Sequence, residues 1–131
     1  MAHLGLQPQK FSSSNKYKIY GRGKNDLTNI LQDASQLEKA GAISILLEGV
    51  ISNVAKQVTK SVSIPTIGIG ASKYCDGQVL VIDDIINLDS SNYKQKFIKT
   101  YTNIESNIIN AVKNFTKDVK NKKFPSKKYS Y

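Results

Sequence analysis

One carboxylate and one imidazole are the side chains of this sequence best placed to do chemistry. Glu48 directly follows the short apolar run 43–47, whose composition predicts a strand that is buried on both faces. Burial raises the pKa of a carboxyl group towards the range that a general base needs near neutrality. A carboxylate at the rim of a sheet can instead pair with a lysine, or cap the helix that is expected to begin near Ser52.

The imidazole belongs to His3, the only histidine, which lies in the otherwise apolar segment 2–6. It is either a structural residue or a hydrogen-bond donor to a substrate carboxylate or oxyanion. Cys75 is the only cysteine, so an internal disulfide is excluded and a reducing compartment, the cytoplasm, is expected. We find no residue spacing typical of a zinc site or of an activated nucleophile.

Two further segments follow predicted strands. Residues 68–72 are small and suit a tight turn at a strand end, but Lys73 occupies the third glycine position of a dinucleotide-binding fingerprint. Asp83 and Asp84 are adjacent, so in a strand they would face opposite sides of the sheet. We therefore expect no shared metal site from this pair.

Apolar residues at steps of three and four predict helices, and short apolar runs predict strands between them. After a strand end and a long loop over 1–24, helices are expected over 25–40, from a cap at Ser52, and from Phe97 to Val119. Strands are expected over 42–47, 66–69 and 78–82. Asn25 or Asp26 is expected to cap the first helix, and Gly41 to end it in a left-handed conformation.

This order of helices and buried strands predicts a parallel α/β sheet covered by helices. An open doubly wound sheet and part of a (β/α)8 barrel both fit the pattern. In either fold, ligands bind beyond the C-terminal ends of the strands. That rule points to Glu48, to residues 70–76 and to the pair Asp83 and Asp84.

Charge and hydropathy exclude some classes of function. The formal net charge is +9, and residues 94–131 hold ten lysines against two acidic residues. The lysines form either a solvated face or a phosphate-binding surface for nucleic acid. Arg22 is the only arginine, and surfaces that read bases favour arginine, so the solvated face is favoured and a nucleic-acid partner is the weaker hypothesis. No apolar run approaches the ~20 residues of a membrane span, and residues 1–9 have no charged leader before an apolar stretch, so neither a membrane partner nor a secretory signal is expected.

Several segments, in order along almost the whole chain, resemble the ketopantoate hydroxymethyltransferase (3-methyl-2-oxobutanoate hydroxymethyltransferase) family. The most distinctive segment is Cys75-Asp76-Gly77-Gln78-Val79-Leu80-Val81. The others are Ala2-His3-Leu4-Gly5-Leu6 with Pro8-Gln9, Tyr17-Lys18-Ile19 with Gly21-Arg22, 37–42, Leu47-Glu48, 64–71, Lys96-Phe97 and Phe124-Pro125.

The resemblance implies a fold and a reaction. The family fold is a (β/α)8 barrel of about 250 residues, and residues 1–120 resemble its C-terminal half, roughly strands five to eight with their helices, followed by a basic polar tail over 121–131. The implied reaction condenses 3-methyl-2-oxobutanoate with the one-carbon unit of 5,10-methylenetetrahydrofolate, assisted by Mg²⁺, in pantothenate biosynthesis. The family's proton acceptor matches Glu48, and its active-site histidine matches His3, a substrate-binding residue by this resemblance.

The resemblance also implies what this chain lacks. The family's metal-binding carboxylates, and a substrate-binding serine and lysine, belong to the other half, so no residue here inherits a metal-binding role. A polarising metal is worth several kcal/mol, and about 4 kcal/mol is roughly a thousandfold in rate, so little turnover is expected from the chain alone. The chain departs from the family pattern at four positions, which are Gln7, Ile51, Ser72 and Asp83.

Two interpretations follow. The chain is a truncated or split hydroxymethyltransferase that needs a first-half partner or a homo-oligomer, or it is a non-catalytic remnant or interaction module of the same fold. In both interpretations, the inner faces of the strands lack their opposing layer of side chains. Such an exposed apolar face is expected to bind a partner, aggregate or stay partly unfolded.

Overall fold

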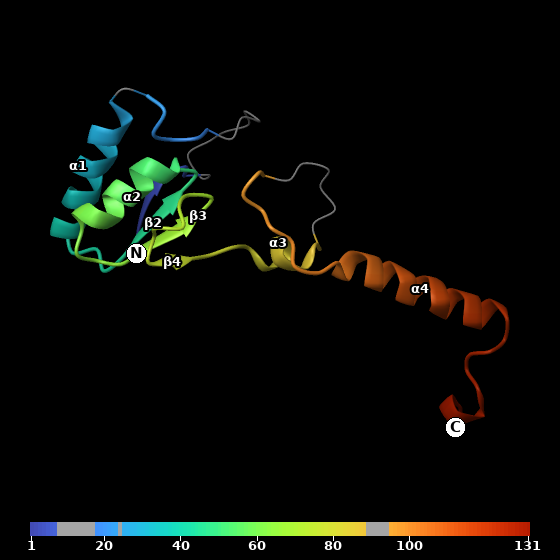
Figure 1. Cartoon of the computed structure of the whole chain (residues 1–131). Helices are drawn as coiled ribbons and strands as arrows, with labels where there is room; N and C mark the ends of the chain where they lie inside the picture. Colours follow the sequence, from blue (N-terminus) through green and yellow to red (C-terminus); the bar gives the residue numbers. More distant parts are fainter. Residues whose placement is uncertain (8–17, 24, 89–94) are drawn as a thin grey trace. The chain divides into compact units, whose positions relative to one another are not determined.

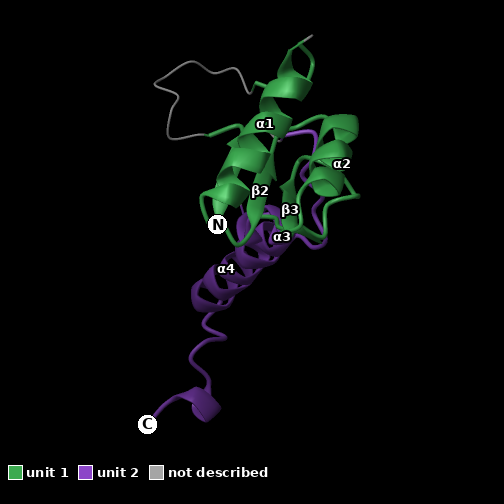
Figure 2. Cartoon of the chain, turned by 90° about the vertical axis from the view of Figure 1, so that its left-hand side faces the viewer, with its two compact units in different colours: residues 1–80 green, residues 81–131 purple. Residues whose placement is uncertain are grey.

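The computed structural model describes residues 1–7, 18–23, 25–88 and 95–131. They form two compact units, residues 1–80 and residues 81–131 (Figures 1 and 2). The loop predicted within 1–24 lies in large part outside the described residues.

Unit 1 contains a parallel sheet whose strand order follows the chain (Figure 1). Its four strands are β1 (Ala2–Gly5), β2 (Ile45–Glu48), β3 (Thr66–Ile69) and β4 (Gly77–Gln78). In the register, His3 lies beside Leu46, and Gly5 lies beside Glu48. The predicted α/β class and the parallel pairing are therefore confirmed.

Two helices cover one face of this sheet. They are α1 (Asp26–Lys39) and α2 (Ser52–Ser61), and they contact each other, so they lie side by side on the same face (Figure 2). The core packs between these helices and the sheet, and its most deeply buried side chains include Ala34, Ile45, Leu47, Ala55 and Val58.

Alternation along the strands sorts the side chains onto two faces. Leu4, Ile45 and Leu47 belong to the core beneath the helices. His3, Leu46, Glu48, Ile67 and Ile69 therefore share the opposite face, where each side chain is only partly buried. The sequence predicted strands buried on both faces, whereas unit 1 by itself covers only one.

The second strand begins later than the apolar run 42–47 suggested. The amide of Ala42 donates to the carbonyl of Leu37, and Gly41 has a φ of 91°, so both residues belong to the turn that ends α1. The side chain of Ile43 is 78% exposed. Regular pairing therefore begins only at Ile45.

The strand predicted over 78–82 was largely wrong. β4 pairs with β3 only at Gly77 and Gln78, and Ile82–Ile86 instead forms the short helix α3. Asp83 and Asp84 occupy the first turn of α3, where acidic side chains interact favourably with the helix dipole. The two aspartates thus favour a helix start over a continued strand.

Unit 2 contains α3 and the long helix α4 (Ile104–Lys120). The predicted start of the long helix at Phe97 was wrong, because the side chain of Asn103 accepts a hydrogen bond from the amide of Ser106 and caps the helix there. The amide of Tyr101 donates to the carbonyl of Ile85, which is not a helical bond.

The arrangement of strands and helices in unit 1 bears on the two folds that the sequence allowed, a doubly wound sheet and part of a (β/α)8 barrel. A doubly wound sheet carries helices on both faces, whereas sequential parallel strands with adjacent helices on one face are the repeating pattern of (β/α) barrels. The four-strand sheet is compatible with part of such a barrel. In the described part of the chain, no helix is long and apolar enough to cross a membrane.

Candidate acid–base site

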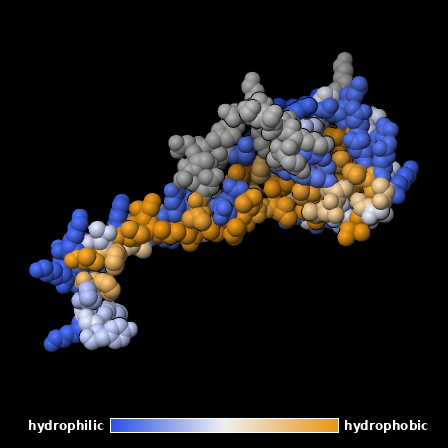
Figure 3. Space-filling view, turned by 180° about the vertical axis from the view of Figure 1, so that it is seen from behind, coloured by the Kyte–Doolittle hydropathy of each residue, from blue (hydrophilic) through white to orange (hydrophobic). Residues whose placement is uncertain are grey.

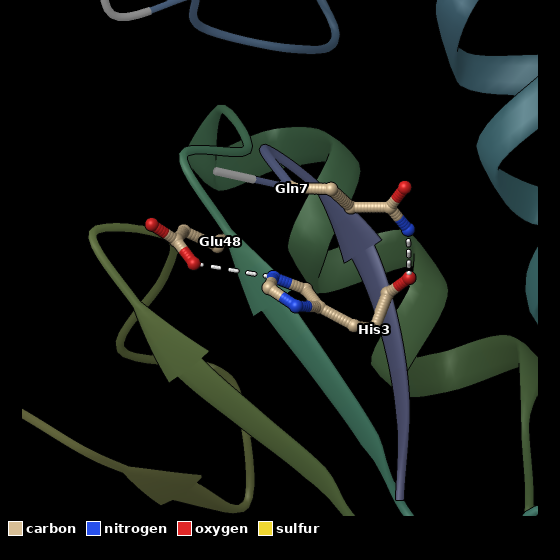
Figure 4. Close-up of polar contacts among 3 residues, drawn as sticks. All are labelled: His3, Gln7 and Glu48. Atoms are coloured by element: carbon tan, nitrogen blue, oxygen red, sulfur yellow. Dashed lines mark hydrogen bonds and ion pairs between the residues drawn. The ribbon is translucent and has the colours of Figure 1, made fainter. Parts of the chain in front are cut away.

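The predicted carboxylate and the predicted imidazole lie together on the sheet. Glu48 is the last residue of β2, and His3 belongs to the neighbouring strand β1. Figure 4 shows the imidazole directed towards the carboxylate across the two strands. The parallel register brings them together, because it places both side chains on the face that α1 and α2 leave uncovered.

The contact is close and sheltered from solvent. Nε2 of His3 lies 3.2 Å from Oε2 of Glu48, with the two side chains 24% and 14% exposed. Nε2 is buried and has no aligned hydrogen-bond partner among the described residues, so the carboxylate lies within reach but off the axis of the N–H bond. Among the described residues, the ion pair of Glu48 is with His3, and no side chain caps the beginning of α2.

Burial and the imidazole act on Glu48 in opposite directions. Burial raises the pKa of the Glu48 carboxyl group, while the nearby imidazole of His3 lowers that pKa, and the net effect is a raised pKa. This is the direction expected for a carboxylate at the end of a buried strand. The group is therefore poised to accept a proton nearer neutrality than an exposed glutamate.

The backbone at the end of β1 is tied to Glu48. The amide of Leu6 donates to the carbonyl of Glu48 over 2.8 Å, and the side-chain amide of Gln7 donates to the carbonyl of His3 over 2.7 Å (Figure 4). Gly5 makes this turn with a φ of 85°, and a Cβ there would clash with the carbonyl oxygen of Glu48. Only glycine allows this approach.

Sequence reasoning missed these supporting contacts. It treated Gln7 only as a departure from the family pattern. The glycine in the resembling segment 2–6 was the available signal, since a glycine directly after a strand marks a turn or a close backbone approach.

The other predicted site residues lie elsewhere. The carboxylate of Asp76 accepts hydrogen bonds from the amide and hydroxyl of Thr66, at the beginning of β3 and not at its C-terminal end. Asp83 and Asp84 belong to α3 in unit 2. Cys75 is buried and belongs to the core.

Two serines connect the loops that follow β2 and β3. Ser52 was predicted to cap α2, but the N-cap position is Ile51, without a side-chain hydrogen bond. The hydroxyl of Ser52 lies 3.0 Å from the hydroxyl of Ser72, which also accepts a hydrogen bond from the amide of Tyr74. Of the predicted site residues, the structure brings together Glu48 and His3.

The described residues do not form a metal site. No three histidine, cysteine, aspartate or glutamate side chains among them lie close enough together to hold an ion. Magnesium prefers several oxygen ligands, whereas the carboxylate at this site has an imidazole beside it. These residues therefore fit proton transfer and do not fit the binding of Mg²⁺.

The fold and the site thus define a parallel α/β protein with a histidine–glutamate pair at the C-terminal end of its sheet. The family model described as ketopantoate hydroxymethyltransferase matches residues 1–127. The chain belongs to this family.

Relatives named 3-methyl-2-oxobutanoate hydroxymethyltransferase match the chain over nearly its whole length. The protein of Thermosipho melanesiensis is 47% identical over 131 residues, which are 100% of this chain and 49% of the relative. The protein of Pelagibacter ubique is 50% identical over 131 residues, again 100% of this chain and 49% of the relative. The protein of Pyrococcus furiosus is 46% identical over 98% of this chain and 45% of the relative. The chain therefore spans about half the length of these relatives.

Proposed function

We propose that this chain supplies the general base of a 3-methyl-2-oxobutanoate hydroxymethyltransferase, and that Glu48 is that base. The observation that carries the proposal is the sheltered carboxylate of Glu48, with its raised pKa, on the face that the helices leave uncovered. The family membership and the relatives' printed names supply the reaction, a hydroxymethyl transfer to a keto acid.

The architecture supports residues 1–120 as the C-terminal half of a (β/α)8 barrel, with 121–131 as a basic tail. Sequential parallel strands with both helices on one face follow the winding of a barrel, and about half of each relative's length corresponds to this chain. In a closed barrel, the partly buried face that carries Leu46, Ile67 and Ile69 would pack against the opposing strands. Apolar surface is also visible on unit 1 in the space-filling view (Figure 3).

The chemistry of Glu48 follows from its position. The carbon next to the carbonyl of the keto acid loses a proton to the Glu48 carboxylate, and the electron pair of that C–H bond remains as an enolate. The enolate carbon then forms a C–C bond with the one-carbon unit, whose bonds to the folate nitrogens break, and water supplies the oxygen of the new hydroxymethyl group. The partly dry setting helps, because it makes the carboxylate a stronger base than an exposed one. His3 lies on the same face and remains the proposed substrate-binding residue.

The remaining partners belong to the same proposal. The name hydroxymethyltransferase fits 5,10-methylenetetrahydrofolate as the one-carbon donor. Mg²⁺ would need ligands from outside the described residues, since these hold no suitable cluster. A first-half chain or a homo-oligomer would provide them, and a cytoplasmic location is part of the same expectation.

The test combines this chain with the N-terminal half of a relative such as the Pelagibacter ubique protein. Turnover of 3-methyl-2-oxobutanoate is measured with Mg²⁺ and 5,10-methylenetetrahydrofolate. We expect turnover in the mixture, little from the chain alone, and a loss of about 10²- to 10⁴-fold in Glu48→Gln, the usual contribution of a general base. Glu38→Gln is the matched control, because Glu38 is a glutamate of the same unit that hydrogen-bonds to Ser63.

Three outcomes would contradict the proposal. Full activity in Glu48→Gln would remove Glu48 as the base. Efficient turnover by the chain alone would show that no other metal-binding part is needed. A folded mixture without turnover would favour the non-catalytic scaffold.

A further inference from the structure

The backbone of the His3–Glu48 pair is held by residues at the end of β1 and directly after it. The Leu6 amide binds the Glu48 carbonyl, the Gln7 side chain binds the His3 carbonyl, and Gly5 allows the two strand ends to approach. Both members of the pair are therefore held by backbone contacts that do not depend on a substrate.

The imidazole of His3 contains a buried nitrogen, Nε2, whose hydrogen-bonding capacity is not satisfied. Nε2 of His3 has no aligned hydrogen bond among the described residues, although Oε2 of Glu48 is only 3.2 Å away. A buried polar atom without a hydrogen bond costs free energy, so a small rotation of either side chain that aligns the two atoms is favoured. Catalytic hydrogen bonds are often poorly aligned before substrate binds.

We propose that His3 is the positioning partner of the base, and that the N–H group at Nε2 donates a hydrogen bond to the Glu48 carboxylate until the carboxylate takes up the substrate proton. This inference rests on the proposed role of Glu48. In this proposal Nε2 of His3 contacts Glu48, whereas the family resemblance implied that His3 contacts the substrate directly.

Proton and charge balance in this step. The C–H bond breaks, its proton forms an O–H bond on Glu48, and its electron pair remains on the substrate. The hydrogen on Nε2 stays on the imidazole, so the pair of side chains holds one proton more than before. The proton then leaves Glu48 for solvent, which restores the carboxylate for the next cycle.

Among the described residues of unit 1, His3 is the ionisable group that faces Glu48. On the other side of β2, strand β3 presents Ile67 and Ile69 on this face. Helices α1 and α2 lie on the opposite face, and the amine of Met1 is at the far end of β1. In the part of the chain that the structure describes, the imidazole is accordingly the only side chain whose charge acts on the pKa of Glu48.

The first experiment follows the side-chain carboxyl carbon of Glu48 by NMR as a function of pH, in the whole chain. His3→Gln removes the influences that lower the Glu48 pKa, so the titration midpoint should move to higher pH. In the unsubstituted chain, the imidazole signal of His3 should change at the pH where Glu48 titrates, and Glu48→Gln should abolish this change. Ile67→Val is the matched control, because it alters packing on the same face without altering charge.

The second experiment measures the pH dependence of kcat and kcat/KM in the reconstituted mixture. His3→Gln should move the rising limb to higher pH, since a base acts only after it has lost its proton. A residue that only binds substrate would raise KM and leave the limb in place.

An unchanged Glu48 midpoint in a folded His3→Gln chain would overturn the inference. So would a shift of equal size in Ile67→Val, because the effect would then be one of packing. The NMR result does not depend on turnover. If the mixture is inactive but His3→Gln still shifts the Glu48 midpoint, the proposed function is refuted and the interaction between His3 and Glu48 is supported.

Discussion

Unit 1 and unit 2 differ in how much of their apolar surface they bury within themselves. Unit 1 packs Ile45, Leu47 and Ala55 to zero exposure. No described residue of unit 2 is buried, and α4 carries Ile108, Val112 and Phe115 at 50%, 58% and 56% exposure. Periodic apolar residues therefore predicted a helix in both units, but only unit 1 contains the surface against which its helices pack.

This difference has a consequence for stability. Burial of apolar side chains is the main favourable contribution to folding, whereas an isolated helix gains little from propensity alone. Unit 1 therefore has its own source of stability. The stability of α4 depends on contacts beyond those that unit 2 makes within itself.

The largest effect is expected from a cavity in unit 1. Leu47→Ala removes a fully buried side chain and should lower the free energy of unfolding by about 2–5 kcal/mol. Val112→Ala, on the exposed face of α4, should change it by less than about 0.5 kcal/mol. Urea denaturation monitored by circular dichroism measures both. Equal losses would show that α4 is packed as tightly as the core.

A smaller effect is expected at two glycines of unit 1 that share a left-handed backbone. Gly41→Ala has open space for its Cβ, so it should lose only the conformational cost of about 1–2 kcal/mol. Gly5→Ala has the same cost and also a clash with the Glu48 carbonyl, so its loss should be larger. Thermal unfolding compares the two variants. An equal loss would mean that the strand ends separate easily, and that the His3–Glu48 contact is not held by the backbone.

The smallest effect is expected for the loss of stability at acidic pH that Asp76 causes. Hydrogen bonds from the Thr66 amide and hydroxyl lower the pKa of Asp76. A carboxyl group with a lowered pKa stabilises the fold above its unfolded pKa, and this contribution disappears as pH falls through the folded pKa. Unit 1 should therefore lose stability below the usual pKa of aspartate, and Asp76→Asn should flatten that part of the curve. Unfolding midpoints between pH 2 and pH 7, roughly the range over which carboxylates titrate, provide the measurement. An unchanged slope in the variant would exclude Asp76 as a contributor.

Local chain preferences predicted much of unit 1 correctly. The step of three and four residues placed α1, Gly41 ended it, and the run at 66–69 coincides with β3. These features follow from contacts between near neighbours in the chain. The strand expected over 78–82 failed because a strand also needs a partner, and only Gly77 and Gln78 pair with β3.

In the candidate site, too, some features were predictable from local sequence and others were not. The sequence by itself determined that Glu48 ends an apolar strand, because strand periodicity is local. Its pairing with His3, the turn at Gly5 and the return of Asp76 to the beginning of β3 were decided by the tertiary structure. Each of these depends on the register between strands or on a fold back across the sheet, and register is set by the packing of whole strands and helices, which no local pattern specifies.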